Sequence, residues 1–309
     1  MSKLKLPSVQ DAVFLPDGRL AAVTKTELYF LTPENNTIEK PVILSENEIR
    51  AKLYLLYDKV TLVIGVSPWH GVGKSEVILY NIQTNTRQML PISEGRLDVL
   101  INLPIHERFL MGFANSTIYA CKLNGEQVEL EETIYCNHSN TSPSLTVSPD
   151  EKYICWYKRV NDTPLAYYLV YLTEGIDKNY WLLEYNQDHP HLFQSLSIAI
   201  SPDHKTLLIS GDTTVFWNLD TLQPVREIKK YGTILWHPVK NYFVLSGITD
   251  TDATDRTKNN SFAFYTAAGE WIADYKSEAG IRKMLFTKEG DRLILLTGHG
   301  RVHIYKTNE

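Results

Sequence analysis

Three short stretches of the sequence contain residue types that could bind a phosphate or a metal ion. The first, residues 71–75, ends in Gly-Lys-Ser, which is how a phosphate-binding loop ends. That motif requires Gly-x4-Gly-Lys-Ser/Thr between a strand and a helix, so that the helix N-terminus faces the phosphate. Here Pro68 occupies the first position, and the residues after Ser75 read as a strand. We therefore predict a glycine-rich hairpin loop at 71–75 and no nucleotide site.

The other two stretches carry histidines and aspartates. His189 and His191 have a spacing that some metal sites use, but no second group of ligands is visible in the sequence. Three aspartates within residues 250–255 could contribute oxygen ligands to Ca²⁺. That loop lacks the Gly and the final Glu of an EF-hand, and Arg256 and Lys258 partly offset its charge. We expect polar loops at both places, with no metal site and no cofactor.

The elements that would position these loops are short strands, arranged in a unit that occurs seven times along the chain. The clearest copy covers residues 192–228. Its strands are expected at residues 197–201, 206–210, 214–218 and 224–228. Pro202, Gly211 and Asp220 lie between these strands, because Pro cannot donate to a sheet ladder and Gly and Asp favour turns. Each unit is therefore expected to form one up-and-down antiparallel sheet.

The repetition predicts how the sheets are arranged. A single four-stranded sheet leaves its edges and one face exposed, and repetition around an axis removes most of that exposure. Seven units in 309 residues give about 44 residues each, within the roughly 40–45 of a propeller blade. The last unit, from Ile281, has three strands, and residues 3–8 form a spare strand before the first unit. We predict an all-β, seven-bladed β-propeller of four-stranded antiparallel blades, a single domain over residues 1–309, with the ring closed by the N-terminal strand completing the last blade.

The run SPDHKTLLISGDTTVFWNLDT, residues 201–221, resembles a blade of the WD-repeat propellers. In that family the third strand of a blade typically ends in Trp-Asp, and Trp217-Asn218 stands in its place here. The Gly-His dipeptide that precedes the first strand in the family is missing, so the family's Asp-His-Ser/Thr-Trp network is not assigned to this chain. As an architecture the resemblance extends over the whole chain. It implies a WD-repeat-like β-propeller and selects no subfamily.

Composition and charge limit the partners and the location of the chain. The net charge of −5 argues against a general binder of nucleic acid or of anionic membranes. No apolar run approaches the roughly 18 residues of a transmembrane helix, and the N-terminal residues lack the apolar core of a signal peptide. Cys121, Cys136 and Cys155 are widely spaced, with no Cys-x-x-Cys pair. This pattern predicts reduced thiols and a cytoplasmic location.

The longest loops of the predicted propeller fall on one face. Strands alternate in direction within a blade, so loops between second and third strands emerge on the same face as loops between blades. The long loops on this face are residues 67–75, 136–142, 158–164, 187–195 and 249–260. Loop insertions gather on the binding face of repeat proteins, so we expect function on this loop-rich face. The predicted partner-binding residues are Trp69, His70, Arg159, His189, His191 and Asp252. An exposed Trp such as Trp69 is a common interface anchor, although it can equally fold over its own blade.

The function that we predict is a non-enzymatic scaffold that binds a protein or peptide on the loop-rich face. A further reading is a subunit of a larger complex. No nucleophile elbow or Cys/His pair has a recognisable context. Acids from separate blades could still meet near a central channel, so a lactonase-like or glycosidase-like hydrolase is the alternative. The aromatic residues of unit four, 142–186, could stack on nucleic-acid bases, but cross-strand packing explains them better.

Overall fold

In the residues that it describes, the computed structural model consists of β-strands and one 3-10 helix, η1 (Pro104–His106). The residues that it describes are 2–6, 8–32, 37–69, 75–90, 95–114, 117–135, 145–159, 166–172, 180–184, 197–211, 213–250, 260–298 and 301–307. They divide into two compact units, Met1–Pro143 with Leu295–Ile304 and Ser144–Ile294 with Tyr305–Glu309. Each unit is described by itself.

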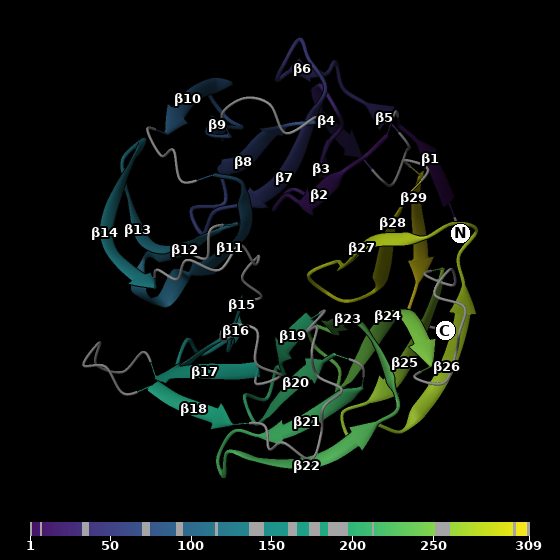
Figure 1. The fold of residues 1–309 in the computed structure, drawn as a ribbon. Coiled ribbons are helices and arrows are strands. Elements are labelled where there is room, and N and C mark those ends of the chain that lie inside the picture. Colours follow the sequence, from purple (N-terminus) through teal and green to yellow (C-terminus); the bar gives the residue numbers. More distant parts are fainter. Residues whose placement is uncertain are drawn as a thin grey trace. The chain divides into compact units, whose positions relative to one another are not determined.

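The first unit contains three antiparallel sheets, each built from strands that follow one another in the chain (Figure 1). The first sheet has the strands β2 (Asp11–Phe14), β3 (Leu20–Val23), β4 (Glu27–Thr32), β5 (Thr37–Ile38) and β6 (Val42–Ile43). The second has β7 (Ile49–Leu55), β8 (Thr61–Pro68), β9 (Glu76–Asn81) and β10 (Thr86–Leu90). The third has β11 (Leu97–Leu103), β12 (Arg108–Phe113), β13 (Ile118–Asn124) and β14 (Gln127–Tyr135).

The second unit repeats this arrangement in three further sheets. The first of them has β15 (Leu145–Val147), β16 (Tyr153–Arg159), β17 (Ala166–Leu172) and β18 (Tyr180–Glu184). The next has β19 (Ser197–Ile200), β20 (Thr206–Ser210), β21 (Thr214–Asn218) and β22 (Gln223–Ile228). The last has β23 (Lys230–Trp236), β24 (Tyr242–Asp250), β25 (Ser261–Thr266) and β26 (Trp271–Lys276). The strands predicted within residues 192–228 are confirmed to within one residue at each end.

The seventh sheet has the order β1–β29–β28–β27. Its strands are β1 (Ser2–Lys5), β27 (Ile281–Phe286), β28 (Arg292–Thr297) and β29 (Arg301–Lys306). β1 runs antiparallel to β29, with Lys3 opposite His303. The spare N-terminal strand therefore pairs with the last strand as predicted, although it covers residues 2–5 and not 3–8. Seven antiparallel sheets in the described residues confirm the all-β prediction and its number of repeats.

The outer strand of the first sheet is divided into two short pieces. Two short strands, β5 and β6, both pair with β4, opposite different ends of it. Pro41 lies between them and has no N–H group to donate to the ladder, which explains the interruption.

The recurring Ser-Pro-Asp turns are closed by their serine side chains. Ser201 Oγ accepts a hydrogen bond from the Thr206 N–H group at 2.9 Å and donates one to Asp203 at 2.5 Å. Ser148 Oγ accepts from the Tyr153 N–H group at 2.9 Å in the equivalent turn. These hydrogen bonds connect the end of the first strand of a sheet to the start of the second strand. The repeated motif in the sequence is therefore a set of turn caps, as its Pro and Asp content predicted.

Polar side chains also join the first two sheets along their first strands. Gln10 accepts a hydrogen bond from the Ala51 N–H group at 2.7 Å and donates one to the Ile49 carbonyl oxygen at 2.6 Å. The buried carboxylate of Asp11 accepts from the Leu53 N–H group at 2.9 Å. Two adjacent residues thus satisfy three backbone groups of β7 that would otherwise lack a partner strand on this side.

Replacing Asp11 by Ala is expected to lower the free energy of unfolding by about 2 kcal/mol, because the buried Leu53 N–H group then loses its acceptor. Asp11→Asn is the matched control, since its amide oxygen can still accept one hydrogen bond, and we expect a smaller loss. Urea denaturation followed by circular dichroism measures both. Equal stability of Asp11→Ala and wild type would contradict this role for the carboxylate.

The core of the second unit is aromatic where β19–β22 pack against β23–β26. Phe243 on β24 is fully buried, and its ring centroid lies 5.1 Å from that of Trp236 and 5.9 Å from that of Phe216. Tyr265 stacks on it at 5.4 Å with an interplanar angle of 17°. One side of β24 and β25 is therefore filled by neighbouring rings, and the opposite side of these strands forms the candidate site.

Candidate functional site

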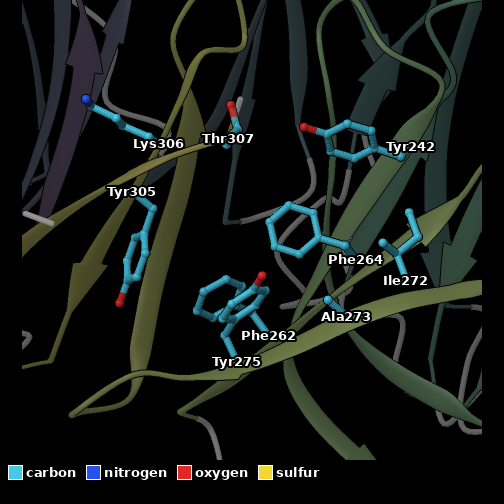
Figure 2. Close-up of a pocket in the computed structure, with 9 residues that line it drawn as sticks. All are labelled: Tyr242, Phe262, Phe264, Ile272, Ala273, Tyr275, Tyr305, Lys306 and Thr307. Atoms are coloured by element: carbon cyan, nitrogen blue, oxygen red, sulfur yellow. The ribbon is translucent and has the colours of Figure 1, made fainter. Parts of the chain in front are cut away.

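The candidate site is a pocket of about 280 Å³ on the side of β24–β26 opposite the aromatic core, within the second unit. It is lined by Tyr242, Phe262, Phe264, Ile272, Ala273, Tyr275, Tyr305, Lys306 and Thr307. Five of these residues are aromatic, and they come from β24, β25, β26 and the end of β29. Figure 2 shows Phe262, Phe264 and Tyr275 grouped together with Tyr305 facing them from β29.

Strand register explains why these side chains share one side of the sheet. Phe264 lies opposite Ala273 and Phe262 lies opposite Tyr275, so all four point to the same face. The register shifts between Phe264 and Tyr265, which leaves Ile272 as an extra residue in β26. This β-bulge places Ile272 beside Ala273 at the pocket, whereas strict alternation would have turned it away.

The aromatic rings hold one another in place. Phe262 stacks on Tyr275 at 5.4 Å with an interplanar angle of 19°, and it meets Tyr305 edge to face at 5.6 Å. Tyr242 meets Phe264 edge to face at 5.8 Å. Offset-stacked and edge-to-face pairs are the favoured geometries of aromatic rings. The pocket wall is therefore formed before any ligand binds.

Behind Tyr242 the pocket is supported by a buried histidine. The His237 ring packs against Tyr242 at 4.5 Å and against Phe286 at 4.9 Å. Its Nδ1 atom accepts from the Lys240 N–H group at 2.7 Å, so the proton lies on Nε2, which donates to the Gly290 carbonyl oxygen at 3.1 Å. Burial lowers the pKa of His237, which favours this neutral form.

The polar groups of the pocket are neutral except for Lys306, whose side chain is directed away from the rings (Figure 2). Burial raises the pKa of Tyr242, and burial together with the charge of Glu278 raises the pKa of Tyr305. Both hydroxyl groups therefore stay protonated at neutral pH and can donate a hydrogen bond. An aromatic wall with a few hydroxyl groups suits an apolar side chain of a ligand.

The outer strand beside the pocket exposes large apolar side chains. Trp271, Ile272 and Tyr275 on β26 have exposed fractions of 59%, 46% and 49%. Ile272 and Tyr275 belong to the pocket lining, whereas Trp271 lies opposite Tyr265 and therefore on the other face of the strand. We call Trp271, Ile272, Tyr275 and the adjoining pocket the β26 surface.

Of the six partner-binding residues predicted from the sequence, the side chain of Trp69 alone is described. The Nζ atom of Lys25 lies 4.8 Å from the centre of its ring, and the guanidinium carbon of Arg50 lies 5.3 Å from that centre. The Trp69 N–H group donates to the Glu48 carbonyl oxygen at 3.2 Å. Trp69 is thus half-buried beside two cations of its own chain, and its role in binding stays a prediction.

The other predicted residues are placed in part or not at all. Arg159 is the last residue of β16, in the other unit from Trp69, and its side chain lies outside the described residues. His70, His189, His191 and Asp252 also lie outside the described residues, as do residues 71–74 of the glycine-rich loop. The residues after Ser75 form β9, so the strand predicted there is confirmed.

The remaining groups with reactive chemistry in the described residues are thiols and possible metal ligands. Cys121 and Cys155 are free and buried, and burial raises the pKa of Cys121 to about 12. No group of three or more His, Cys, Asp or Glu side chains in the described residues is placed to hold a metal ion. The described part contains no helix with the length and apolarity needed to cross a membrane.

Comparison with known proteins identifies the fold and no activity. No protein-family model matches the chain, and no curated protein matches its sequence. A chain in the crystal structure of a mitotic checkpoint complex is similar over 100% of this chain and 94% of its own length, with a TM-score of 0.73 and 13% sequence identity. In all, 1356 solved chains match, so the fold is common and does not by itself select a function. The likeness agrees with the β-propeller fold predicted from the repeats.

Sequence reasoning overlooked the β26 surface. A signal was present, because residues 271–276 read Trp-Ile-Ala-Asp-Tyr-Lys and so place three large apolar or aromatic residues on one outer strand. The contribution of Tyr305 could not be read from the sequence, since it depends on how β29 packs beside β25 in space.

Proposed function

We propose that the chain is a non-enzymatic scaffold that binds a protein or peptide partner through the β26 surface. The observation that carries this proposal is a preformed aromatic pocket at an outer strand that exposes three large apolar side chains, two of which line the pocket. Trp and Tyr are the commonest anchors of protein interfaces, because each buries a large area while losing little conformational freedom. A partner that covers β26 would remove Trp271, Ile272 and Tyr275 from water.

The fold supports this function. We propose that the seven sheets form one WD-repeat-like β-propeller domain over residues 1–309, with the ring closed through the pairing of β1 with β29. A rigid ring presents a binding surface without first ordering it, so little entropy is lost on association. The similar chain in the solved structures belongs to a protein complex, which agrees with a role in protein binding. The buried free thiols agree with a cytoplasmic location, which is part of the proposal.

The loop-rich face is a second proposed binding surface. It contains Trp69, whose ring already lies between two cations, and the loops that hold the remaining predicted residues. A partner there would meet a tryptophan fixed in one orientation, which favours binding over a mobile side chain.

Affinity capture from native lysate tests which surface is used. The chain is compared with Trp271→Lys/Tyr275→Lys, with Trp69→Ala/Arg159→Ala, and with the control Val225→Lys on the outer strand β22, after circular dichroism shows that all are folded. We expect the β26 variant to lose a partner that wild type and the control retain. Loss with the Trp69 variant alone would move the site to the loop-rich face. Retention by every variant would refute binding at either surface.

A further inference from the structure

We propose that His237 makes the aromatic pocket sensitive to acid: protonation of its ring opens the turn between β23 and β24 and releases Tyr242 from the pocket wall. The pocket is then intact at neutral pH and lost on acidification. This inference goes beyond the proposed function, because it concerns the state of the pocket and holds whatever the pocket binds. It is carried by three features of the second unit: the position of His237 in the repeat, the hydrogen bonds of its ring, and its contact with the pocket.

His237 occupies a turn position at which three other turns of the second unit carry a hydroxyl group. In all four turns the residue at this position donates its N–H group to the carbonyl oxygen five residues later. The four pairs are Ser148–Tyr153, Ser201–Thr206, His237–Tyr242 and Thr287–Arg292. The hydroxyl groups of Ser148, Ser201 and Thr287 also accept the N–H group of that later residue. A hydroxyl group accepts at any ordinary pH, whereas an imidazole that takes up a proton can only donate. Of these four turns, the one before β24 is therefore the turn whose side-chain cap titrates.

The His237 ring is fully buried and hydrogen-bonded at both nitrogens. Its Nδ1 atom accepts from the Lys240 N–H group at 2.7 Å and from the Val239 N–H group at 3.1 Å. Its Nε2 atom donates to the Gly290 carbonyl oxygen at 3.1 Å. A proton added to Nδ1 would point at two N–H groups and deprive both of their acceptor, which is costly at a buried site. The charged ring therefore cannot keep this position, and the turn must change.

The same ring supports two residues that line the pocket, Tyr242 and Thr307 (Figure 2). The centroids of the His237 and Tyr242 rings are 4.5 Å apart. The Gly290 carbonyl oxygen, which accepts from His237, also accepts from the Thr307 hydroxyl group. Displacement of the His237 ring would therefore remove the support of Tyr242 and release the turn that holds Thr307. Tyr242 in turn packs edge to face on Phe264, so the wall of the pocket would lose a further contact.

The groups that face His237 from its own turn, from β24 and from β27 do not stabilise a charged ring. Burial lowers the pKa of His237, the hydrogen bond to Gly290 raises it, and the positive charge of Lys240 lowers it again. Tyr242 of β24 is neutral, because burial raises the pKa of its hydroxyl group. Phe286 of β27 presents an aromatic ring. None of these groups supplies the negative charge that an imidazolium would need.

The turn of residues 287–292 packs against His237 through Gly290, and its charges are balanced within the turn. Asp291 accepts a hydrogen bond from the Thr287 hydroxyl group at 2.6 Å, and its carboxylate lies 3.6 Å from Nε of Arg292. Lys288 and Glu289 are exposed and opposite in charge. This turn therefore gives the protonated ring no net negative charge either.

The direction of the pH dependence follows from these contacts. The folded protein binds the proton of His237 less readily than the opened turn does, because the ring has a lowered pKa in the closed turn. The contribution of His237 to stability is therefore complete above the ordinary histidine pKa of about 6.5, and it is lost as the pH falls below that value. A ring that stays unprotonated in the closed turn raises the opening constant by about tenfold between pH 7.5 and pH 5.5.

Residue-resolved hydrogen exchange of the full chain at pH 7.5 and pH 5.5 tests the inference, with protection factors corrected for the intrinsic exchange rate at each pH. The Val239 and Lys240 amides report the His237 turn, and the Thr206 amide, whose acceptor is the Ser201 hydroxyl group, is the internal control. The Ile272 methyl signals report the pocket, since Ile272 lines it together with Tyr242. His237→Gln has a side-chain oxygen that can accept but cannot titrate, and His204→Gln is the matched control on another turn.

In wild type and His204→Gln we expect protection of the Val239 and Lys240 amides to fall about tenfold at pH 5.5, with a change in the Ile272 methyl signals. The Thr206 amide should keep its protection, and a folded His237→Gln protein should show no such pH response. If His237→Gln does not fold, the pH titration of the His237 ring in wild type decides, because its midpoint should match that of the Ile272 change. Unchanged protection at Lys240, an equal loss at Thr206, or the same response in His237→Gln would overturn the inference. Capture of a partner at neutral pH could still stand in each of these cases.

Discussion

Gly290→Ala is expected to destabilise the protein by about 3 kcal/mol, because the new methyl group has no space and the backbone is left-handed at this position. Gly290 has φ = +72°, and its Cβ would clash with the Cε1 and Nε2 atoms of His237. The His237 ring cannot move aside, since it is buried between Tyr242 and Phe286 and is hydrogen-bonded at both nitrogens. Thermal and urea unfolding measure the loss.

Gly18→Ala is the matched control for this prediction. Gly18 occupies an equivalent turn, its φ is +84°, and no atom lies within 4 Å of a Cβ placed there. Both glycines donate their N–H group to the residue three positions earlier, Leu15 and Thr287 respectively. Gly18→Ala should therefore cost only the backbone strain of about 1 kcal/mol. Equal losses for the two variants would mean that His237 does not restrict Gly290.

Phe243→Ala is expected to lower the free energy of unfolding by about 3–5 kcal/mol. The side chain is fully buried, and its removal leaves a cavity between Phe216, Trp236 and Tyr265. These rings are held by further neighbours, so they cannot close the cavity without losing their own contacts. Urea denaturation followed by tryptophan fluorescence reports the loss, because Trp236 is adjacent to the site.

Phe243→Leu is the control for this second prediction, since it keeps most of the apolar volume. It should cost less than half of the effect of Phe243→Ala. A loss below about 1 kcal/mol for the alanine variant would show that the surrounding rings repack. The pocket lies on the other side of β24 and β25, so a folded Phe243→Leu protein should still capture a partner that the proposed β26 surface binds.

The repeats made much of this fold predictable. Ser-Pro-Asp turns at Ser148 and Ser201 mark the same step in two sheets, and their hydrogen bonds explain why the motif recurs. The pairing of β1 with β29 followed from a spare strand at one end and a missing strand at the other. Pro41 indicates in the same way that the outer strand of the first sheet is interrupted, because proline cannot donate to the ladder.

The candidate site was less predictable for two physical reasons. First, a binding surface depends on side chains from strands distant in sequence, as Phe262 and Tyr305 show, and no spacing rule connects them. Second, the β-bulge at Ile272 changes which residues of β26 face the pocket, and period-two alternation cannot foresee it. Loop length predicted partner binding at Trp69 and the long loops, whereas the pocket in the described residues is formed by strands.

The pairing of β1 with β29 also determines when the seventh sheet can be completed during biosynthesis. Lys3 and His303 are opposite each other in the sheet but 300 positions apart in the chain. At about 5–20 residues per second, roughly 15–60 s pass between the synthesis of these two residues. Of the described strands, β1 is therefore synthesised first and finds its partner last. Until then the seventh sheet lacks a strand, and a chaperone or a second nascent chain has time to meet the unpaired edge.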